Sequence, residues 1–570
     1  MIKKLNISRK LTWSIVIFVI LLTATIIRFY QLGNPSRGFY LDEAAIGYNA
    51  YSILKTGKDE FGKSFPILFR SFTDFKAPLY IYLSIIPIKI LGLTPFSTRF
   101  LSALSGSIAI LIAFSFVKLI VNRNPKSGKL PINYFFHSLV ALVLAIAPWH
   151  VFYSRGAWEA NLSFLILLAA SYYCILGFER KKRTIFLLGS VLFVLSTYAY
   201  HGQRIVAPLI FGFYLIYCRK WLFENKKFLV LGFTILVLFS LPILKISLTP
   251  GGQSRLNSLS IFSKEIILPW HTEDSRFLSN NRYLVSIRKG LALYTTYFSP
   301  RNLFSPDPAE KQRWLVDLSA FYPWQFIFFI IGIFIFIRKK EYSPLRNIVL
   351  PWLFFSPVAA SVTRDPFSTV RALPLVFPIS VIIGIGLYET ILFVKEKISL
   401  KFNQKFTNAS IFFLLSSIVI VSLVNLSIQF LFVLPHQRAK YWELGYSEVA
   451  KELLKYPNEK IIIDNFRGES YIHILFFTKF DPETYQKEAG YLELTNYYYS
   501  FERASIKKFG QFEYREIDWK KEKAEENLFV GDELLASKES ILSDPLLKLI
   551  KEVKYPDQSV VFRIIKANKD

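Results

Sequence analysis

Three acidic residues and a lysine in the first polar segment have the types and the spacing for acid–base and phosphate chemistry. Asp42 and Glu43 open a stretch predicted to be helical, which Gly57 ends. Asp74 and Lys76 follow before the next apolar run. A carboxylate can take a proton from an attacking hydroxyl, and a lysine can neutralise an anionic leaving group. The alternative reading is that Asp42 and Glu43 only supply favourable charge to a helix N-terminus.

The composition around these residues is that of a polytopic membrane protein. The 570 residues are 52% apolar, include 55 Phe and have a mean hydropathy of +0.33. The net charge of +27 comes from residues 1–434, which carry 47 Lys and Arg against 18 Asp and Glu, whereas 435–570 carry 22 against 24. Because the basic residues cluster between apolar runs, they indicate membrane orientation and not nucleic-acid binding. Cys174 and Cys218 form no disulfide or metal-ligand pattern.

Eleven apolar runs predict transmembrane helices, two of them short, and the first is expected to be a retained helix and not a cleaved signal peptide. The runs are 11–29, 98–120, 132–152, 161–178, 184–200, 204–218, 226–246, 321–338, 345–361, 369–394 and 410–434. A further run, 79–93, is short and contains Pro87 and Lys89, which favours a helix lying at the membrane interface.

Charge decides the orientation of these runs. If 79–93 does not cross, six segments on one side hold 24 Lys and Arg against four acidic residues, so that side is the cytoplasm and holds the N-terminus. We therefore expect a multi-pass protein of the cell (inner) membrane. Every connection with unusual polar residues then lies outside, and their convergence predicts a site. These connections are 30–97, 153–160, 200–204, 247–320, 362–370 and the tail from 435.

The sequence thus predicts a membrane domain over 1–434, with a large first outer loop (30–97) and a long outer loop (247–320), followed by a small extracytoplasmic α/β domain over 435–570. In the tail, three apolar runs bounded by polar turns read as strands, and an amphipathic pattern covers 540–552. The runs are 460–464, 527–532 and 559–565.

Cations stand at the predicted outer ends of several apolar runs. Arg155 and Glu159 are four residues apart and could share a helix face, with an interfacial ion pair as the alternative. Arg371 lies about two residues inside an apolar run, where an unpaired charge is costly and is usually functional or paired. His201 and Arg204 stand at the mouth of a helix hairpin with Tyr200, where snorkelling to the interface competes with function.

Carboxylates beside permanent cations suit a reaction in which a neutral acceptor loses a proton while a phosphate leaves. A catalytic face outside the cell has no nucleotide at hand, so the activated donor is expected to come from the lipid. A polyprenyl-phosphate-linked sugar fits: the phosphate meets the cations and the sugar carbon faces the carboxylates.

The first outer loop also resembles a known family. Asp42-Glu43, the following Gly-Tyr-Asn-Ala-Tyr-Ser-Ile-x-x-Thr-Gly, and Asp74-Phe-Lys76-Ala-Pro78-Leu-Tyr are similar to the GT-C superfamily of membrane glycosyltransferases. Within it, the chain resembles the dolichyl-phosphate-mannose protein mannosyltransferases and the lipid A aminoarabinose transferases. The likeness covers about residues 10–435 and is strongest over 38–120 and 148–205.

This resemblance implies an inverting transfer from a polyprenyl-phosphate sugar. Asp42 stands where the family places its catalytic carboxylate, with Glu43 beside it. Lys76 resembles the lysine of the family's Glu-Lys-Pro element, which approaches the donor phosphate, although Asp74 is one residue further from the lysine than the family's glutamate. Glu159 lies where many members have Asp. His201 and Arg204 lie in the corresponding third outer connection.

The prediction is therefore a membrane glycosyltransferase that moves a sugar from a polyprenyl-phosphate donor to an acceptor hydroxyl. No metal is expected to be obligatory, although a divalent cation remains an option, and the acceptor is a protein, a lipid or a glycan. The alternatives are a flippase or transporter of lipid-linked oligosaccharides and a non-catalytic subunit of the same fold. The expected roles are catalysis for Asp42 and Glu43, donor-phosphate binding for Lys76, His201, Arg204 and Arg371, and substrate positioning for Asp74, Arg155, Glu159 and Tyr200.

Overall fold

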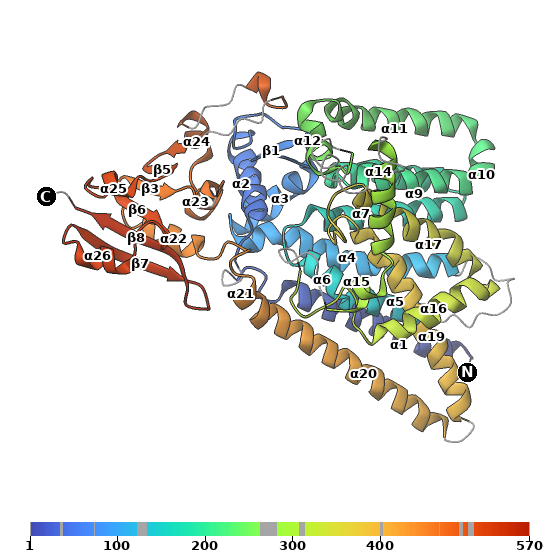
Figure 1. The fold of residues 1–570 in the computed structure, drawn as a ribbon. Helices are drawn as coiled ribbons and strands as arrows, with labels where there is room; N and C mark the ends of the chain where they lie inside the picture. Colours follow the sequence, from blue (N-terminus) through green and yellow to red (C-terminus); the bar gives the residue numbers. More distant parts are fainter. Residues whose placement is uncertain are drawn as a thin grey trace, which may run out of the picture. The chain divides into compact units, whose positions relative to one another are not determined.

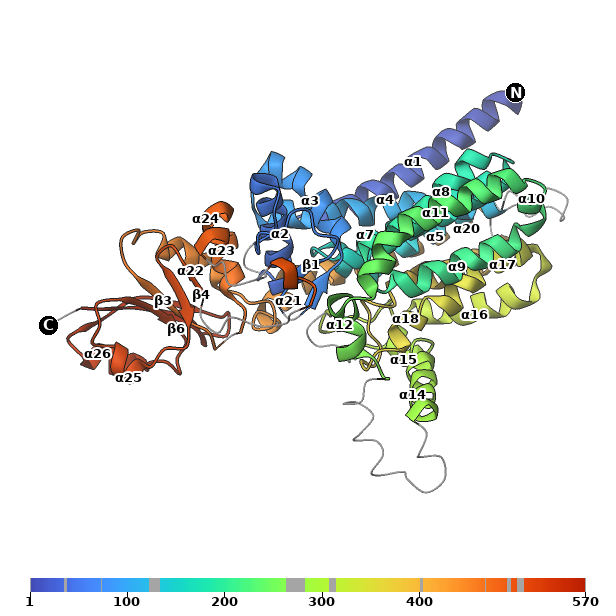
Figure 2. The ribbon, with the colours of Figure 1, turned by 90° about the horizontal axis from the view of Figure 1, so that it is seen from above.

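A computed structural model describes residues 2–34, 38–72, 74–121, 134–262, 282–306, 314–399, 403–466, 468–488, 494–499 and 507–568 (Figures 1 and 2). The chain divides into two compact units. The helical unit contains Met1–Tyr30, Ser102–Leu244 and Arg255–Gln429. The loop–tail unit contains Gln31–Leu101, Lys245–Ser254 and Phe430–Asp570, so the first outer loop and the C-terminal tail belong to one unit.

Most helices of the helical unit are apolar. Its helices are α1 (Ile2–Phe29), α4 (Pro95–Val121, from Ser102 onward), α5 (Tyr134–Ile146), α6 (Pro148–Ser154), α7 (Glu159–Glu179), α8 (Arg183–Ala199), α9 (Gln203–Tyr217), α10 (Arg219–Phe223), α11 (Lys226–Ser247, up to Leu244), α14 (Arg282–Thr296), α15 (Pro300–Phe304), α16 (Gln325–Arg338), α17 (Ser343–Phe355), α18 (Val358–Ser361), α19 (Val376–Ser399) and α20 (Gln404–Ile428). Short turns η3 (Lys340–Tyr342) and η4 (Leu373–Leu375) lie between them, and α12 (Pro250–Leu259) begins in the other unit.

Small residues let these helices approach closely. Helix α7 packs against α8, and α19 packs against α16 and α5. A Cβ atom at Gly189 of α8 would lie 2.5 Å from the backbone nitrogen of Cys174 in α7, and one at Gly386 of α19 would lie 1.8 Å from the carbonyl of Phe328 in α16. Such close backbone contacts at small residues are typical of helix packing in membranes.

All eleven predicted apolar runs fall on helices, but fewer are long enough to cross a membrane alone. Within the described residues, five helices are long and apolar enough, or six if α5 and α6, bent by 59° at Ala147, form one span. Helices α8, α9 and α16 are apolar but shorter. The chain is thus built on apolar helices of membrane type, and the total of eleven spans stays a prediction. The run 79–93 forms the 14-residue helix α3 (Pro78–Leu91).

In the loop–tail unit, α2 (Leu41–Thr56) is the central helix of the first loop. It packs against α3 and against two helices of the tail, α23 (Tyr471–Thr478) and α24 (Pro482–Glu488). The hairpin of β1 (Phe69–Ser71) and β2 (Asp74–Lys76) joins α2 to α3. The tail contains η5 (Gln429–Val433), α21 (Leu434–Gln437), α22 (Tyr446–Leu453), β3 (Ile461–Asp464), α23 (Tyr471–Thr478), α24 (Pro482–Glu488), η6 (Leu494–Asn496), β4 (Lys507–Phe509), β5 (Phe512–Arg515), α25 (Trp519–Glu522), β6 (Leu528–Gly531), α26 (Lys538–Ser543), β7 (Leu547–Lys554) and β8 (Val560–Ala567).

The tail folds around a six-stranded sheet in the order β4-β5-β3-β6-β8-β7. Strands β5, β3 and β6 are parallel, and the other pairs are antiparallel. Helices lie on both faces, α22 and α23 on one and α25 and α26 on the other (Figures 1 and 2). Ile462, Phe529 and Ile565 are register partners on the neighbouring strands β3, β6 and β8, and they form a core with Ile541 of α26. The predicted strands at 460–464, 527–532 and 559–565 are confirmed as β3, β6 and β8.

Other parts of the chain differ from the prediction or lie outside the described residues. The amphipathic pattern over 540–552 covers the end of α26 and most of β7, because an edge strand with one covered face also alternates apolar and polar residues. Strands β4 and β5 were not predicted, and each has only three or four residues. Part of the long loop 247–320 forms α12, α14 and α15, whereas 263–281 and 307–313 lie outside the described residues.

Candidate active site

The first turn of α2 carries the two acidic residues that the sequence singled out. Tyr40 is the N-cap, and its backbone N–H donates to Oε2 of Glu43 at 3.1 Å, which satisfies one of the free amides at the helix start. Gly57 ends the helix in the left-handed conformation at φ 70°. The predicted helix start and end are thus both confirmed. Consecutive residues on a helix point in different directions, so Asp42 and Glu43 meet different neighbours.

Asp42 contacts the lysine of the β hairpin. Nζ of Lys76 donates to Oδ1 of Asp42 at 2.6 Å. The Lys76 side chain is 5% exposed, whereas that of Asp42 is 33% exposed. Because β2 ends at Lys76 and Pro78 opens α3, the lysine is held between a paired strand and a helix N-terminus. The structure therefore presents an accessible carboxylate beside a buried ammonium group, 34 residues apart in sequence.

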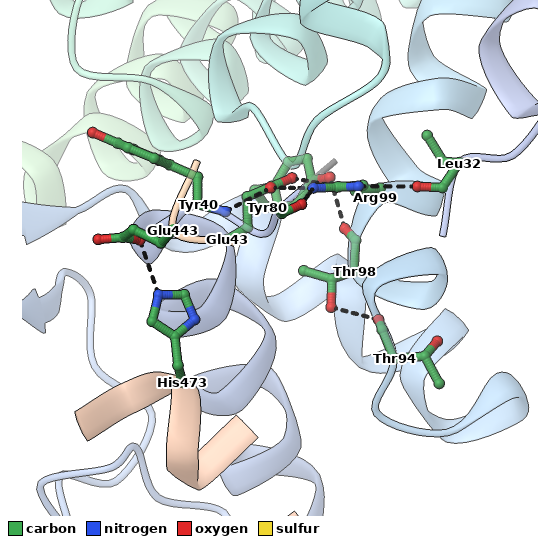
Figure 3. Close-up of polar contacts among 10 residues, drawn as sticks. Leu32, Tyr40, Glu43, Tyr80, Thr94, Thr98, Arg99, Glu443 and His473 are labelled. Carbon is green, nitrogen blue, oxygen red and sulfur yellow. Dashed lines mark hydrogen bonds and ion pairs between the residues drawn. The ribbon is translucent and has the colours of Figure 1, made fainter. Parts of the chain in front are cut away.

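Glu43, in contrast, is closed off by an arginine that the sequence reasoning did not select. Its carboxylate accepts from Nε of Arg99 at 2.8 Å and from Nη2 at 2.6 Å, and both side chains are nearly fully buried (Figure 3). Arg99 also donates to the carbonyls of Leu32 and Gly38 at 3.1 and 3.0 Å. This bidentate pair ties the start of α2 to the segment before it and to the start of α4. Its geometry is that of a structural pair and not of a carboxylate presented to a substrate.

A signal for Arg99 was present in the sequence. Arg99 is the second residue of the apolar run 98–120, so its charge stands inside the run just as that of Arg371 does. A charge at such a position is costly unless it is paired. The same argument that selected Arg371 therefore applies to Arg99.

Asp74 begins β2 and is partly buried. Its Oδ1 accepts from the backbone N–H of Phe75 at 2.7 Å and from the hydroxyl of Ser254 at 3.3 Å. Asp74 thus links the hairpin to the segment 245–254, which belongs to the same unit.

The other predicted site residues belong to the helical unit. Arg155 is the C-cap of α6, and Glu159 is the first residue of α7, so the expectation that both share one helix face is wrong. The chain turns between the two helices, with Trp158 as the N-cap of α7. The guanidinium of Arg155 donates to the carbonyls of Ile27 and Tyr30 at the end of α1.

The turn between α8 and α9 presents the predicted aromatic and basic group. Tyr200 is the C-cap of α8 in an extended conformation and is mostly buried. His201 lies in the turn, and its carbonyl accepts from the backbone N–H of Arg204, in the first turn of α9, at 3.1 Å. The three side chains thus come from one tight helix hairpin, as the sequence predicted.

Arg371 is paired within its own connection. Nη1 donates to Oδ2 of Asp365 at 2.5 Å and to the hydroxyl of Thr363 at 3.0 Å. The Arg371 side chain is 13% exposed and that of Asp365 is 42% exposed. The sequence predicted that the charge of Arg371 is paired or functional, and pairing is confirmed. Because Asp365 is accessible, the pair can also meet a substrate, and a functional role for Arg371 stays a prediction.

A second polar cluster, in the loop–tail unit, surrounds the residues that follow α2. Burial raises the pKa of the Asp59 carboxyl to about 7, and burial also raises the pKa of Glu60. Glu60 accepts from Asn49 and from the hydroxyl of Tyr471, both at 2.9 Å. Lys507 lies over the ring of Tyr471, with Nζ 3.3 Å from the ring centroid, and its burial lowers its pKa. Both carboxylates are buried and hydrogen-bonded, which is the arrangement expected of a structural junction.

Among the described residues, no group of three or more His, Cys, Asp or Glu side chains has the arrangement of a metal site. The pairs of opposite charge, Asp42–Lys76 and Asp365–Arg371, are instead the accessible ionic contacts at the predicted positions.

Comparisons with known proteins identify the fold. No family model and no curated protein matches the sequence. Among solved structures, the chain is similar to ArnT from Cupriavidus metallidurans in the apo state, with a TM-score of 0.50 and 11% identity over 97% of both chains. It is also similar to the same ArnT bound to undecaprenyl phosphate, with a TM-score of 0.51 and 11% identity over 97% of this chain and 98% of that one. The chain therefore has an ArnT-like fold, as the resemblance in the first outer loop predicted.

Proposed function

We propose that the chain is a membrane glycosyltransferase that moves a sugar from a polyprenyl-phosphate donor to an acceptor hydroxyl on the outer face of the cell membrane. The observation that carries the proposal is the contact between Asp42 and Lys76 in a fold shared with ArnT, one of whose structures is bound to undecaprenyl phosphate. An accessible carboxylate beside a buried ammonium group suits a transfer in which a proton is taken up and a phosphate leaves.

In the proposed reaction, the acceptor oxygen attacks the anomeric carbon of the donor sugar from the side opposite the phosphate. The new bond between that oxygen and the carbon forms as the bond from the carbon to the phosphate oxygen breaks, which inverts the configuration. The electron pair leaves with the phosphate, and the acceptor proton passes to the carboxylate of Asp42. Lys76 stabilises the charge on the departing phosphate.

The pairing of Asp42 with Lys76 has a consequence for the order of events. The ammonium group of Lys76 and the carboxylate of Asp42 neutralise each other where they meet. A donor phosphate that binds Lys76 offers the ammonium group another anion, which frees the Asp42 carboxylate to accept a proton. Donor binding would thus prepare the base.

The remaining site residues are assigned by their chemistry. Glu43, held by Arg99, sets the direction of the first turn of α2 and positions Asp42 without contacting substrate. Donor-phosphate binding is proposed for His201, Arg204 and Arg371, and substrate positioning for Arg155, Glu159 and Tyr200. The mechanism needs no obligatory metal, since Lys76 supplies the positive charge at the phosphate.

The test is sugar transfer by the purified full-length protein in lipid, with a panel of radiolabelled polyprenyl-phosphate sugars and acceptor extracts, in the presence and absence of EDTA. Asp42→Asn should lower turnover by about 10²–10⁴, the contribution of a general base. The matched control is Asp518→Asn, which removes an exposed carboxylate at the start of α25 in the tail and should leave turnover unchanged.

If the unmodified chain and Asp42→Asn both bind the donor lipids and neither turns them over, the result would instead favour the transporter or the non-catalytic subunit. Loss of turnover with EDTA would refute the metal-independent mechanism.

A further inference from the structure

A short segment of the C-terminal tail, 494–499, contacts the hairpin that carries Lys76. The η6 turn in this segment lies beside β1 in both views (Figures 1 and 2). The carbonyl of Tyr498 accepts from the backbone N–H of Gly251 at 2.8 Å, and the hydroxyl of Tyr498 accepts from the N–H of Ile67 at 3.1 Å. The side chain of Tyr497 is completely buried.

The hydroxyl of Tyr497 joins two parts of the first outer loop. It donates to Oδ2 of Asp59 at 2.5 Å and accepts from the backbone N–H of Arg70 at 2.7 Å. Arg70 is the middle residue of β1 and stands opposite Phe75 of β2. A single tail hydroxyl therefore fixes the hairpin to the turn that follows α2.

The ring of Tyr497 supports the other strand of the hairpin. It packs edge-on against Phe75 with centroids 6.1 Å apart, and the two rings share a buried cluster with Leu68 and Ile246. Successive side chains of a strand point to opposite faces. With Phe75 directed into this cluster, Lys76 is directed away from it, and there its Nζ meets Asp42.

We propose that Tyr497 is a positioning residue for Lys76, so that the C-terminal tail forms part of the donor-phosphate site although it contributes no group to the reaction. This inference rests on the proposed function, in which Lys76 binds the donor phosphate.

The contacts of Tyr497 explain why its hydroxyl matters. The other oxygen of Asp59 already accepts from the N–H groups of Phe61 and Lys63 at 3.0 and 2.8 Å. Without the hydroxyl, a buried carboxylate loses one donor and the N–H of Arg70 loses its acceptor. Buried polar groups left without partners are costly, so the hairpin is expected to shift until both groups find others. Lys76 would move with it.

The experiment measures binding of undecaprenyl phosphate to the full-length protein in lipid nanodiscs. Tyr497→Phe keeps the ring and removes the hydroxyl, and it should weaken binding about tenfold, the size expected when buried polar groups lose a hydrogen-bond partner. Tyr499→Phe is the matched control, because it makes the same chemical change three residues after the end of η6, at a side chain that is 59% exposed. Equal affinities for the two variants would overturn the proposal.

A double-mutant cycle separates positioning from general loss of structure. Lys76→Met should itself weaken binding, and Tyr497→Phe should then add little, because its effect passes through Lys76. If Tyr497→Phe weakens binding by the same factor with Met at position 76, the positioning role is refuted. If Lys76→Met binds undecaprenyl phosphate as tightly as the unmodified chain, the proposed function fails instead.

A second variant covers the case in which Tyr497→Phe does not fold. Phe75→Leu keeps an apolar side chain of similar size at the contact with the Tyr497 ring. It should also weaken binding, and the effect should also disappear in the Lys76→Met background. An additive effect in that background would count against the proposal in the same way.

Discussion

Arg99 is the residue whose loss should most damage the start of α2. Its guanidinium makes four hydrogen bonds, two to Glu43 and one each to the carbonyls of Leu32 and Gly38 (Figure 3). Arg99→Met would leave the Glu43 carboxylate, 1% exposed, buried without its counter-charge. Breaking a buried ion pair by removing one partner costs about 3–5 kcal/mol.

We expect Arg99→Met to lose much of the stability of the unit, and a second substitution at Glu43 to restore part of it. For a folding unit of this size, that free energy corresponds to a fall of about 10 °C in the unfolding temperature. The double variant Arg99→Met with Glu43→Gln removes both charges, and the glutamine oxygen can still accept from the N–H of Tyr40. We expect it to regain about 2 kcal/mol relative to Arg99→Met alone, because no unpaired charge remains. The stability of Arg99→Lys should lie between that of the unmodified chain and that of Arg99→Met, because a lysine keeps the positive charge but cannot make the bidentate contact.

The assay is thermal unfolding of the full-length chain in detergent, followed in parallel by sugar transfer. The matched control is Lys339→Met, which removes a half-exposed lysine from a pair with Glu389 and should change stability by less than about 1 kcal/mol. The reasoning is refuted if Arg99→Met is as stable as the control, or if the double variant is less stable than Arg99→Met.

Two further predictions concern the same unit. Burial raises the pKa of Asp59 to about 7, so the folded chain holds a proton there that the unfolded chain releases near pH 4. The contribution of Asp59 to stability should therefore be fully present at low pH and should fall by a few kcal/mol as the pH rises from about 4 to about 7. Glu60, whose pKa is raised by the same burial, adds to this slope. In Asp59→Asn, whose amide can donate to Tyr497, the slope of unfolding temperature between pH 5 and pH 7.5 should be shallower, and an unchanged slope would show that Asp59 does not titrate there. Gly38 has φ 74°, and a Cβ atom there would lie 2.1 Å from the carbonyl oxygen of Trp442, so Gly38→Ala should lower stability by more than about 2 kcal/mol. Gly62 also has a positive φ, 86°, but a Cβ atom there meets nothing within 4 Å, so Gly62→Ala should cost only about 1 kcal/mol; equal losses of unfolding temperature in the two alanine variants would rule out the steric explanation.

The sequence by itself determined that the chain is built on apolar helices of membrane type, and it located α2, the central helix of the first outer loop. Runs of apolar residues can be read directly because a helix in a bilayer must satisfy its backbone hydrogen bonds internally and present apolar side chains to lipid. All eleven runs form helices. The boundaries of α2 were predictable for a local reason, since Asp42 and Glu43 mark a helix start and Gly57 favours the left-handed end. The ArnT-like fold followed from motifs in the same loop.

Only the tertiary structure decided which charges meet. Asp42 and Glu43 are neighbours with the same charge, and the sequence assigned both to catalysis. The fold places Lys76 against one and Arg99 against the other, from positions 34 and 56 residues away. No periodicity encodes such contacts, because each depends on how a hairpin and the start of α4 pack against α2.

The tail shows the same limit most clearly. Three of its six strands, β3, β6 and β8, were predicted from short apolar runs. The association of the tail with the first outer loop was not, because Tyr497 meets Asp59 and Arg70 across more than 400 residues of sequence. A tyrosine in a polar segment carries no local sign that it will be buried. Burial, and with it the raised pKa of Asp59 and the placement of Lys76, arises only when segments distant in the chain exclude water from one another.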